Sequence, residues 1–166
     1  MTPITFQPAG DFATFDAALE RSPDSADVLF QRGRLLASLG QVDGAMADLD
    51  KAIALVPNYT RALTSRGRLS RLQSNFDAAI SDFDSVIALE PRNTFALTQR
   101  GDTHTLKKDF AKAIADYDRV LAILPNDATA RSQRAAAAAQ LAAAGGTAPA
   151  AAPPGQAAKP GQVGSP

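Results

Sequence analysis

The sequence predicts an all-α fold, a solenoid of helix–turn–helix repeats, and two observations support this prediction. One block occurs three times in succession without an insertion, at 26–59, 60–93 and 94–127. One glycine and one proline recur in step in every block, as Gly33, Gly67 and Gly101 and as Pro57, Pro91 and Pro125. Because a unit of this size cannot bury its own apolar face, successive units must stack to form one core.

Each block divides into two helices, which we call helix A and helix B. In the second block, apolar and small residues at helical spacing mark helix A at Ala62, Leu63, Gly67 and Leu72, and helix B at Phe76, Ala79, Ile80, Phe83, Val86, Ile87 and Leu89. We expect the break between them at Gly40 in the first block and at the N-cap candidates Asn75 and Asp109 in the others. Helix B must end before the proline, because the residue preceding a proline is forced out of the α region. The next helix A is then predicted to be capped by Asn58, Asn93 or Asp127.

The flanking segments are predicted to complete the stack. Within 1–25 we expect an irregular lead-in over 1–10 and a short amphipathic helix over 11–21 that corresponds to helix B of a half-repeat. Residues 128–144 begin like another helix A but are rich in alanine, which predicts a terminal helix that caps the last apolar face. Residues 145–166 are rich in Ala, Pro and Gly without periodicity and predict a disordered tail, with a docking segment as the alternative.

The composition argues against catalysis. The chain has no cysteine and one histidine, His104, so neither a thiolate nor a second histidine can complete a metal or catalytic centre with it. The glycine motifs that bind nucleotide phosphates do not occur. We therefore expect a non-enzymatic protein with no cofactor, no metal and no small-molecule substrate.

The formal net charge is zero, which gives no overall attraction to nucleic acid or to an anionic membrane. The chain does not begin with a basic segment followed by an apolar one, and no apolar run reaches the length of a membrane span. We expect a cytoplasmic protein that is not an integral membrane protein.

The repeat resembles the tetratricopeptide repeat family, whose units are helix–turn–helix pairs of the same length as the block found here. Besides the glycine and the proline, three places match in register: a bulky residue at Leu29, Leu63 and Leu97, an alanine at Ala45, Ala79 and Ala113, and a large residue at Leu49, Phe83 and Tyr117. The resemblance covers 26–127 directly and 11–144 with the half-repeats, and it implies a right-handed superhelix. The sequence departs from the family pattern before the glycine, where arginine replaces leucine, and after it, where the aromatic is replaced by Leu36, Ser70 and His104.

The arginine before each glycine belongs to a row of charges, Arg32, Arg66, Arg100 and Arg134. An arginine near a packing face needs a carboxylate, because an unpaired buried charge is costly. Carboxylates precede all four at one constant spacing, at Asp16, Asp50, Asp84 and Asp118, and follow the first three at the same spacing, at Asp48, Asp82 and Asp116. We predict a structural ladder of ion pairs and favour the preceding set, which joins a helix B to the following helix A. A row of arginines offered to a ligand is the alternative.

In the tetratricopeptide repeat family, helix A lines a concave groove that binds peptides or protein segments. The resemblance therefore implies a groove with nine candidate contacts: Phe30, Arg34, Arg61, Thr64, Arg68, Arg71, Phe95, Thr98 and Asp102. Arginine grips carboxylates in bidentate geometry and stacks on aromatic rings, so we expect an acidic peptide or a C-terminal carboxylate with an apolar anchor. A solvated helix face is the alternative.

Other protein-binding modes stay open. One group within the family binds the acidic C-termini of heat-shock chaperones through a Lys/Asn/Asn/Lys/Arg clamp, but the clamp positions here hold Phe30, Arg34, Ser65, Phe95 and Gln99, so this activity is not transferred. The chain could instead be an assembly scaffold that uses its edges rather than the groove. A nucleic-acid-associated protein that uses the arginines on phosphates is a further alternative.

Overall fold

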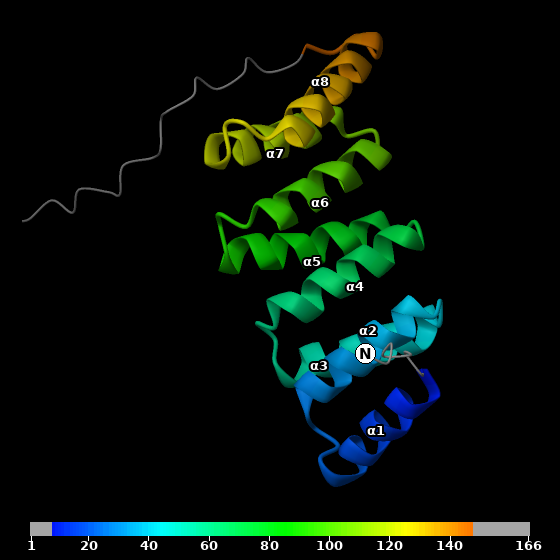
Figure 1. Cartoon of the computed structure of the whole chain (residues 1–166). Helices are drawn as coiled ribbons and strands as arrows, with labels where there is room; N and C mark the ends of the chain where they lie inside the picture. Colours follow the sequence, from blue (N-terminus) through cyan, green and yellow to red (C-terminus); the bar gives the residue numbers. More distant parts are fainter. Residues whose placement is uncertain (1–7, 148–166) are drawn as a thin grey trace, which may run out of the picture. The chain divides into compact units, whose positions relative to one another are not determined.

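A computed structural model describes residues 8–147, and within this range the chain forms eight α-helices and no strand (Figure 1). The chain divides into two compact units, which we call the N-terminal unit (to Pro91) and the C-terminal unit (from Arg92). The N-terminal unit holds α1 (Pro8–Arg21), α2 (Ala26–Ser38), α3 (Val42–Leu55), α4 (Thr60–Leu72) and α5 (Phe76–Leu89). The C-terminal unit holds α6 (Thr94–Leu106), α7 (Phe110–Ile123) and α8 (Ala128–Ala143). The predicted all-α repeat fold is confirmed.

The helices start with the period of the sequence. Successive A helices are α2, α4, α6 and α8, and the B helices are α1, α3, α5 and α7. Helix α1 begins at Pro8, one repeat length before the start of α3, so it is a B helix of full length rather than the shorter 11–21 helix. The prediction of an irregular chain was therefore wrong for 8–10, since a proline is tolerated in the first turn of a helix. The rest of the predicted lead-in, and the predicted tail beyond Thr147, lie outside the described residues.

The turn from helix A to helix B is a backbone motif that recurs at one place in each repeat. Gly40, Ser74 and Lys108 have φ of +74°, +61° and +64°. The amide of the next residue then donates to a carbonyl five residues earlier, as in Asn75 N to Ser70 O at 2.8 Å. This left-handed ending satisfies carbonyls that the helix leaves free. The sequence indicated this turn through its glycine only in the first repeat.

Side-chain caps hold three of the A helices. Ser25 accepts a hydrogen bond from the Val28 amide, Asn93 from the Ala96 amide and Asp127 from the Ala130 amide. The prediction of a cap at Asn58 was wrong, because the N-cap of α4 is Tyr59, which forms no side-chain cap. Asn75 and Asp109 are N-caps of α5 and α7 as predicted, although their side chains form no cap bond.

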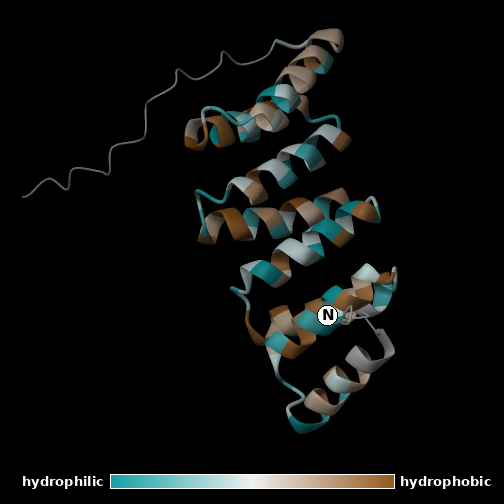
Figure 2. Ribbon diagram, in the orientation of Figure 1, coloured by the Kyte–Doolittle hydropathy of each residue, from teal (hydrophilic) through white to brown (hydrophobic). Residues whose placement is uncertain are grey.

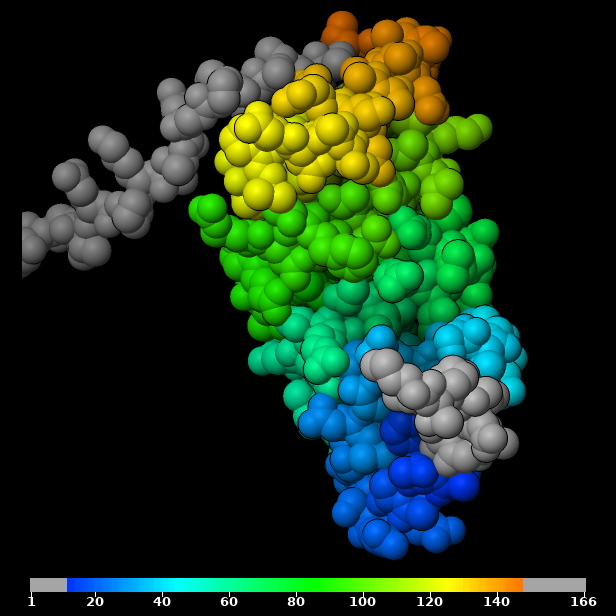
Figure 3. Space-filling model, viewed as in Figure 1, coloured from blue at the N-terminus to red at the C-terminus, as the bar shows by residue number. Residues whose placement is uncertain are grey.

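Helices A and B of a repeat meet at the glycine. A Cβ built on Gly33 would lie 3.3 Å from Leu49 Cγ, and one built on Gly67 would lie 3.0 Å from Phe83 Cε1. Gly101 is tighter still, with Tyr117 Cε1 at 2.8 Å. The glycines are therefore required by the close approach of the two helices. In the space-filling view α4 and α5 accordingly pack without a visible gap (Figure 3).

Each unit has its own apolar core beneath amphipathic helices. Brown, apolar residues alternate with teal, polar ones along α5 (Figure 2). In the N-terminal unit α2 packs against α1 and α3, and α3 packs against α4, around Leu29, Ala45, Leu49 and Ala52. In the C-terminal unit α7 packs against α6 and α8, and Ala137 of α8 covers Ala113, Ile114 and Tyr117. Among the helices of residues 8–147, none is both long and apolar enough to cross a membrane.

Candidate functional site

The arginine ladder of the N-terminal unit is held from two sides. The Nε and Nη2 atoms of Arg32 donate to the two carboxylate oxygens of Asp48 at 2.7 Å, while Nη1 donates to Asp16 at 2.7 Å. Arg66 repeats this geometry, with Asp82 at 3.0 and 2.6 Å and Asp50 at 2.7 Å. Each arginine thus joins the B helix before it to the B helix of its own repeat, and the bidentate contact goes to the acid that the sequence analysis ranked second.

The acids on the two sides differ in burial. The side chain of Asp82 is 5% exposed, whereas that of Asp50 is 58% exposed. The hydrogen bonds that Arg66 donates to Asp82 hold the pKa of Arg66 above its usual range, with a smaller contribution from Asp50, against the opposite effect of burial. Arg32 shows the same upward shift of its pKa, caused first by Asp48. Each of these arginines therefore uses three guanidinium donors on carboxylates of its own chain.

The ladder continues within the C-terminal unit. Arg100 donates to both oxygens of Asp116 at 2.9 and 2.5 Å, and Arg134 donates to Asp118 at 2.5 and 3.3 Å. Asp84, the remaining acid of the predicted row, lies on α5 in the N-terminal unit. Within the C-terminal unit, Arg134 therefore pairs with the B helix before it and Arg100 with the B helix of its own repeat.

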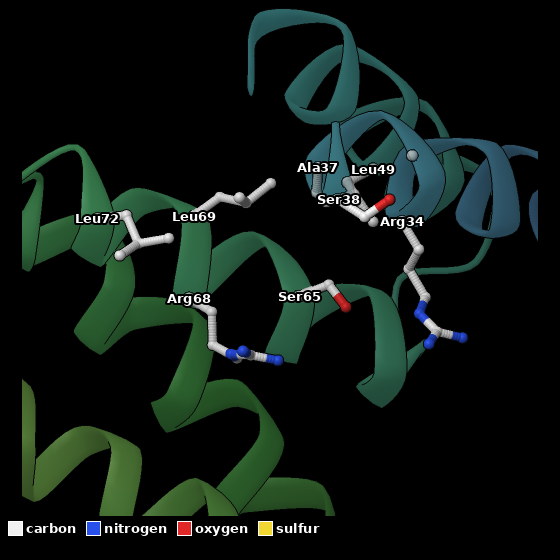
Figure 4. Close-up of a pocket in the computed structure, with 9 residues that line it drawn as sticks. Arg34, Ala37, Ser38, Leu49, Ser65, Arg68, Leu69 and Leu72 are labelled. Atoms are coloured by element: carbon white, nitrogen blue, oxygen red, sulfur yellow. The ribbon is translucent and has the colours of Figure 1, made fainter. Parts of the chain in front are cut away.

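A hollow of about 300 Å³ lies between α2 and α4, and we call it the α2–α4 hollow. Arg34, Ser65 and Arg68 line one side and point the same way, with the Ser65 hydroxyl between the two guanidinium groups (Figure 4). The rest of the lining is mainly apolar, with Ala37, Leu49, Leu69 and Leu72 beside Gly33 and Ser38. Leu49 is buried, whereas Leu72 is 75% exposed. The hollow is therefore amphipathic, with a cationic side and an apolar side.

The prediction of Phe30 as a groove contact assumed that a ligand could reach its ring, but the ring is buried. Phe30 is 2% exposed, and its ring lies 5.1 Å from that of Tyr59. The Arg34 and Arg61 guanidinium carbons lie 5.6 and 4.8 Å from the centre of the Phe30 ring. Cation–π contact of this kind holds a guanidinium group in place. Phe30 therefore holds Arg34 and Arg61 in place through cation–π contacts.

The hydroxyl of Tyr59 completes this arrangement by donating to Asp27 at 2.5 Å. Burial and, to a smaller degree, the bond to Asp27 raise the pKa of Tyr59 to about 12, so the phenol stays protonated at neutral pH. Tyr59 thus ties the start of α4 to α2 and keeps its ring against Phe30.

The cations of this surface lack carboxylate partners. Within residues 8–147, no carboxylate lies within 4 Å of the guanidinium groups of Arg34, Arg61 and Arg68, and the single hydrogen bond among them is a long one of 3.4 Å from Arg34 to Gln31. Thr64 and Arg71, the remaining α4 candidates, are half-buried. The chain thus leaves positive charge unbalanced at this place, although it pairs every arginine of the ladder.

The other three candidates lie in the C-terminal unit. Phe95 is 50% exposed on α6, and Thr98 donates its hydroxyl to the Thr94 carbonyl. Asp102 Oδ1 accepts hydrogen bonds from Tyr117 and Gln133, both at 2.8 Å, beside a hollow of about 270 Å³. Burial, first of all, raises the pKa of Tyr117 above its usual range. Asp102 is therefore engaged in the internal contacts of its own unit.

Sequence reasoning missed part of the α2–α4 hollow. Ser65 was considered only as a clamp position, and Leu69 and Leu72 were not considered as contacts. A helical projection carries the signal, because these residues lie three to seven positions apart on α4 and so share its face with Arg68. His104 is 7% exposed, and the described residues hold no group of His, Cys, Asp or Glu able to bind a metal ion.

Comparison with known proteins gives the same picture of the fold. A sequence model described as Tetratricopeptide repeat matches residues 13–60 and 65–128. No curated protein matches the sequence. The crystal structure of MamA is similar over 81% of this chain and 74% of its own, with 21% identity and a TM-score of 0.76. The Arabidopsis OM64 TPR domain is similar over 68% of this chain and 93% of its own, with 20% identity and a TM-score of 0.63.

A third solved structure contains a ligand. The first TPR of Spaghetti (RPAP3), bound to the HSP90 peptide SRMEEVD, is similar over 70% of this chain and 93% of its own. It has 27% identity and a TM-score of 0.67.

Proposed function

The chain belongs to the tetratricopeptide repeat family, and from this premise we propose that it is a non-catalytic protein-interaction module. Its N-terminal unit binds an acidic peptide or protein segment in the α2–α4 hollow. The observation that carries the proposal is the pair of arginines without carboxylate partners, Arg34 and Arg68, beside the apolar residues of the hollow. Arg61, which also lacks a carboxylate partner, stacks on the same Phe30 ring as Arg34. A segment with a carboxylate and a neighbouring apolar side chain complements both sides of the hollow.

The chemistry of arginine supports an anionic partner. A guanidinium group is planar and presents its donors as a fork that matches a carboxylate, and it sheds water more easily than an ammonium group. Stacking on Phe30 limits the motion of Arg34 and Arg61 before a ligand arrives, so less conformational entropy is lost on binding. The similar RPAP3 domain binds a peptide with two glutamates and a C-terminal aspartate, which also supports an acidic ligand.

Selection from a random peptide library tests the proposal. We expect the intact chain to enrich peptides that combine Asp or Glu with an apolar residue. Replacement of both cations, as Arg34→Glu with Arg68→Glu, should weaken binding of the selected peptides at least about tenfold, because a bond to a charged group contributes about 1.5–3 kcal/mol. The matched control reverses two exposed arginines outside the hollow, Arg21→Glu with Arg92→Glu, and should change affinity less than about twofold.

Circular dichroism must show that both double variants keep their helix content. Enrichment of peptides without acidic residues, or equal loss of binding in the control pair, would show that the hollow is not the ligand site. Binding that survives the reversal of Arg34 and Arg68 would instead favour a scaffold that uses its edges.

A further inference from the structure

Three donor groups on the cationic side of the α2–α4 hollow, those of Arg34, Ser65 and Arg68, form few or no hydrogen bonds within the chain. The Arg34 guanidinium has one long hydrogen bond, to Gln31, and within the described residues neither Arg68 nor the Ser65 hydroxyl has a hydrogen-bond partner. Other hydroxyls on the helices commonly donate to a carbonyl of their own helix, as those of Ser38, Thr98, Thr103 and Thr105 do. The Ser65 hydroxyl remains available between the two guanidinium groups (Figure 4).

These donors suit a dianion better than a carboxylate. A carboxylate carries one charge on two oxygens, whereas a phosphoryl group carries about −1.5 to −2 and has three acceptor oxygens. Two guanidinium forks and one hydroxyl can all donate to a single phosphoryl group, whereas a single carboxylate would leave one cation unbalanced. On the basis of the function proposed above, we propose that Arg34, Ser65 and Arg68 bind a phosphorylated serine or threonine of the partner protein.

The apolar side of the hollow favours a protein as the source of the phosphoryl group. Leu69 and Leu72 of α4 and Ala37 of α2 can receive an apolar side chain next to the modified residue. A volume of about 300 Å³ is at the lower end for ligand sites, so it suits one modified residue and one neighbour. Nucleic-acid binding relies on many phosphate contacts and on exposed aromatic rings for stacking, but Phe30 at this surface is buried.

Matched peptide pools test the inference directly. Three fluorescein-labelled pools of nonapeptides have degenerate flanks and differ only at the central residue, which is phosphoserine, glutamate or serine. We expect anisotropy titrations of the full chain to show at least about tenfold tighter binding of the phosphoserine pool than of the glutamate pool, as one further charge-assisted bond would give. The serine pool should bind most weakly.

Three variants assign the effect to the hollow. Ser65→Ala should weaken binding of the phosphoserine pool about three- to tenfold and leave the glutamate pool within about twofold, because only the third phosphoryl oxygen needs the hydroxyl. Arg34→Lys with Arg68→Lys keeps the charge but removes the forks, so it should reduce the preference for phosphoserine. The control Arg21→Glu with Arg92→Glu should retain the preference.

The outcomes separate this inference from the proposed function. If the glutamate pool binds as tightly as the phosphoserine pool, and both depend on Arg34 and Arg68, the phosphoryl site is refuted while the acidic-segment function stands. If no pool depends on these arginines, both are refuted. An oligothymidylate that binds more tightly than the phosphoserine pool, and is lost on reversal of the same arginines, would show a nucleic-acid surface instead.

Discussion

Gly101 is the position where one added methyl group tests the helix contact most directly. In Gly101→Ala the new Cβ would lie 2.8 Å from Tyr117 Cε1 and 3.1 Å from Cζ. Tyr117 cannot swing aside easily, because it is 2% exposed and its hydroxyl donates to Asp102 at 2.8 Å. The same change at Gly33 meets the Ala45 carbonyl oxygen, Asp48 Cβ and Leu49 Cγ, all at 3.3 Å, so the overlap is less severe than at Gly101.

Two opposing effects set the magnitude. Alanine in place of a helical glycine stabilises by about 0.5–1 kcal/mol, whereas overpacking a filled core costs about 1–3 kcal/mol. The short contact makes overpacking the larger effect at Gly101, so we expect a net loss of about 1–2 kcal/mol in the free energy of unfolding. At Gly33 the two effects nearly cancel, and the net change should stay within about 0.5 kcal/mol.

Urea unfolding followed by circular dichroism measures the change in the free energy of unfolding for both variants. In thermal unfolding, Tm should fall by roughly 2–4 °C per kcal/mol lost for a chain of this size. A double-mutant cycle with Tyr117→Leu, which reproduces the residue of the first repeat, identifies the cause. In that background Gly101→Ala should cost at least about 1 kcal/mol less. The reasoning is refuted if Gly101→Ala is as well tolerated as Gly33→Ala, or if its cost is the same beside leucine.

Three further predictions concern stability. Lys108→Gly should raise the free energy of unfolding by about 0.5–1 kcal/mol, since Lys108 has φ +64° and glycine adopts this region without strain; an unchanged or lower Tm would contradict this. Arg66→Leu should cost about 2–3 kcal/mol in urea unfolding, because it leaves Asp82 buried without a cation, whereas Asp50→Asn at an exposed acid should cost under about 1 kcal/mol; equal costs would argue against this. Burial lowers the pKa of His104 in the folded chain below its ordinary 6.5. As the pH falls, the unfolded chain therefore binds the proton before the folded chain does, and the free energy of unfolding should decline below about pH 6.5. His104→Tyr should flatten this decline in unfolding curves measured from about pH 5 to 8, and an unaltered slope would assign it to other groups.

The sequence predicted the helices well because three copies of one pattern report on the same structure. The glycine and proline that recur in step determine where each helix pair packs and ends, so the bounds follow the period. The turn residues Ser74 and Lys108 could not be identified in this way, since neither residue type demands a positive φ. Their conformation follows from the backbone bonds that close helix A, which the first repeat alone signals through Gly40.

The site was less predictable because its geometry depends on contacts between repeats. Arg34 and Arg68 occupy one place in successive A helices, and the resemblance to the tetratricopeptide repeat family suggested that this place lines a shared groove. Phe30 was predicted as a groove contact, but it is buried, because Tyr59 at the end of its own block and Arg61 at the start of the next pack against its ring. A residue pattern on one helix cannot show what a later helix places over it.

The partners of the arginine ladder were likewise hard to predict from the pattern of residues on single helices. Acids lie at equal spacing before and after Arg32 and Arg66, and the preference for the preceding set did not identify the bidentate partner. The structure uses both, and it gives the bidentate contact to the more buried acid. Burial, which a single sequence does not report, decides which partner is the stronger one.

The two-sided pairing of Arg32 and Arg66 also bears on how such a chain changes in length. In the N-terminal unit, α1 and α3 each present an aspartate to the arginine of the next A helix at the same register, so removal of residues 26–59 would bring Arg66 to Asp16 as Arg32 is now. Loss of a fragment of a block would instead leave an arginine or an aspartate alone. Ion pairing is therefore compatible with duplication or deletion of whole repeats and disfavours changes of part of a repeat. It leaves the surface residues of each copy free to diverge.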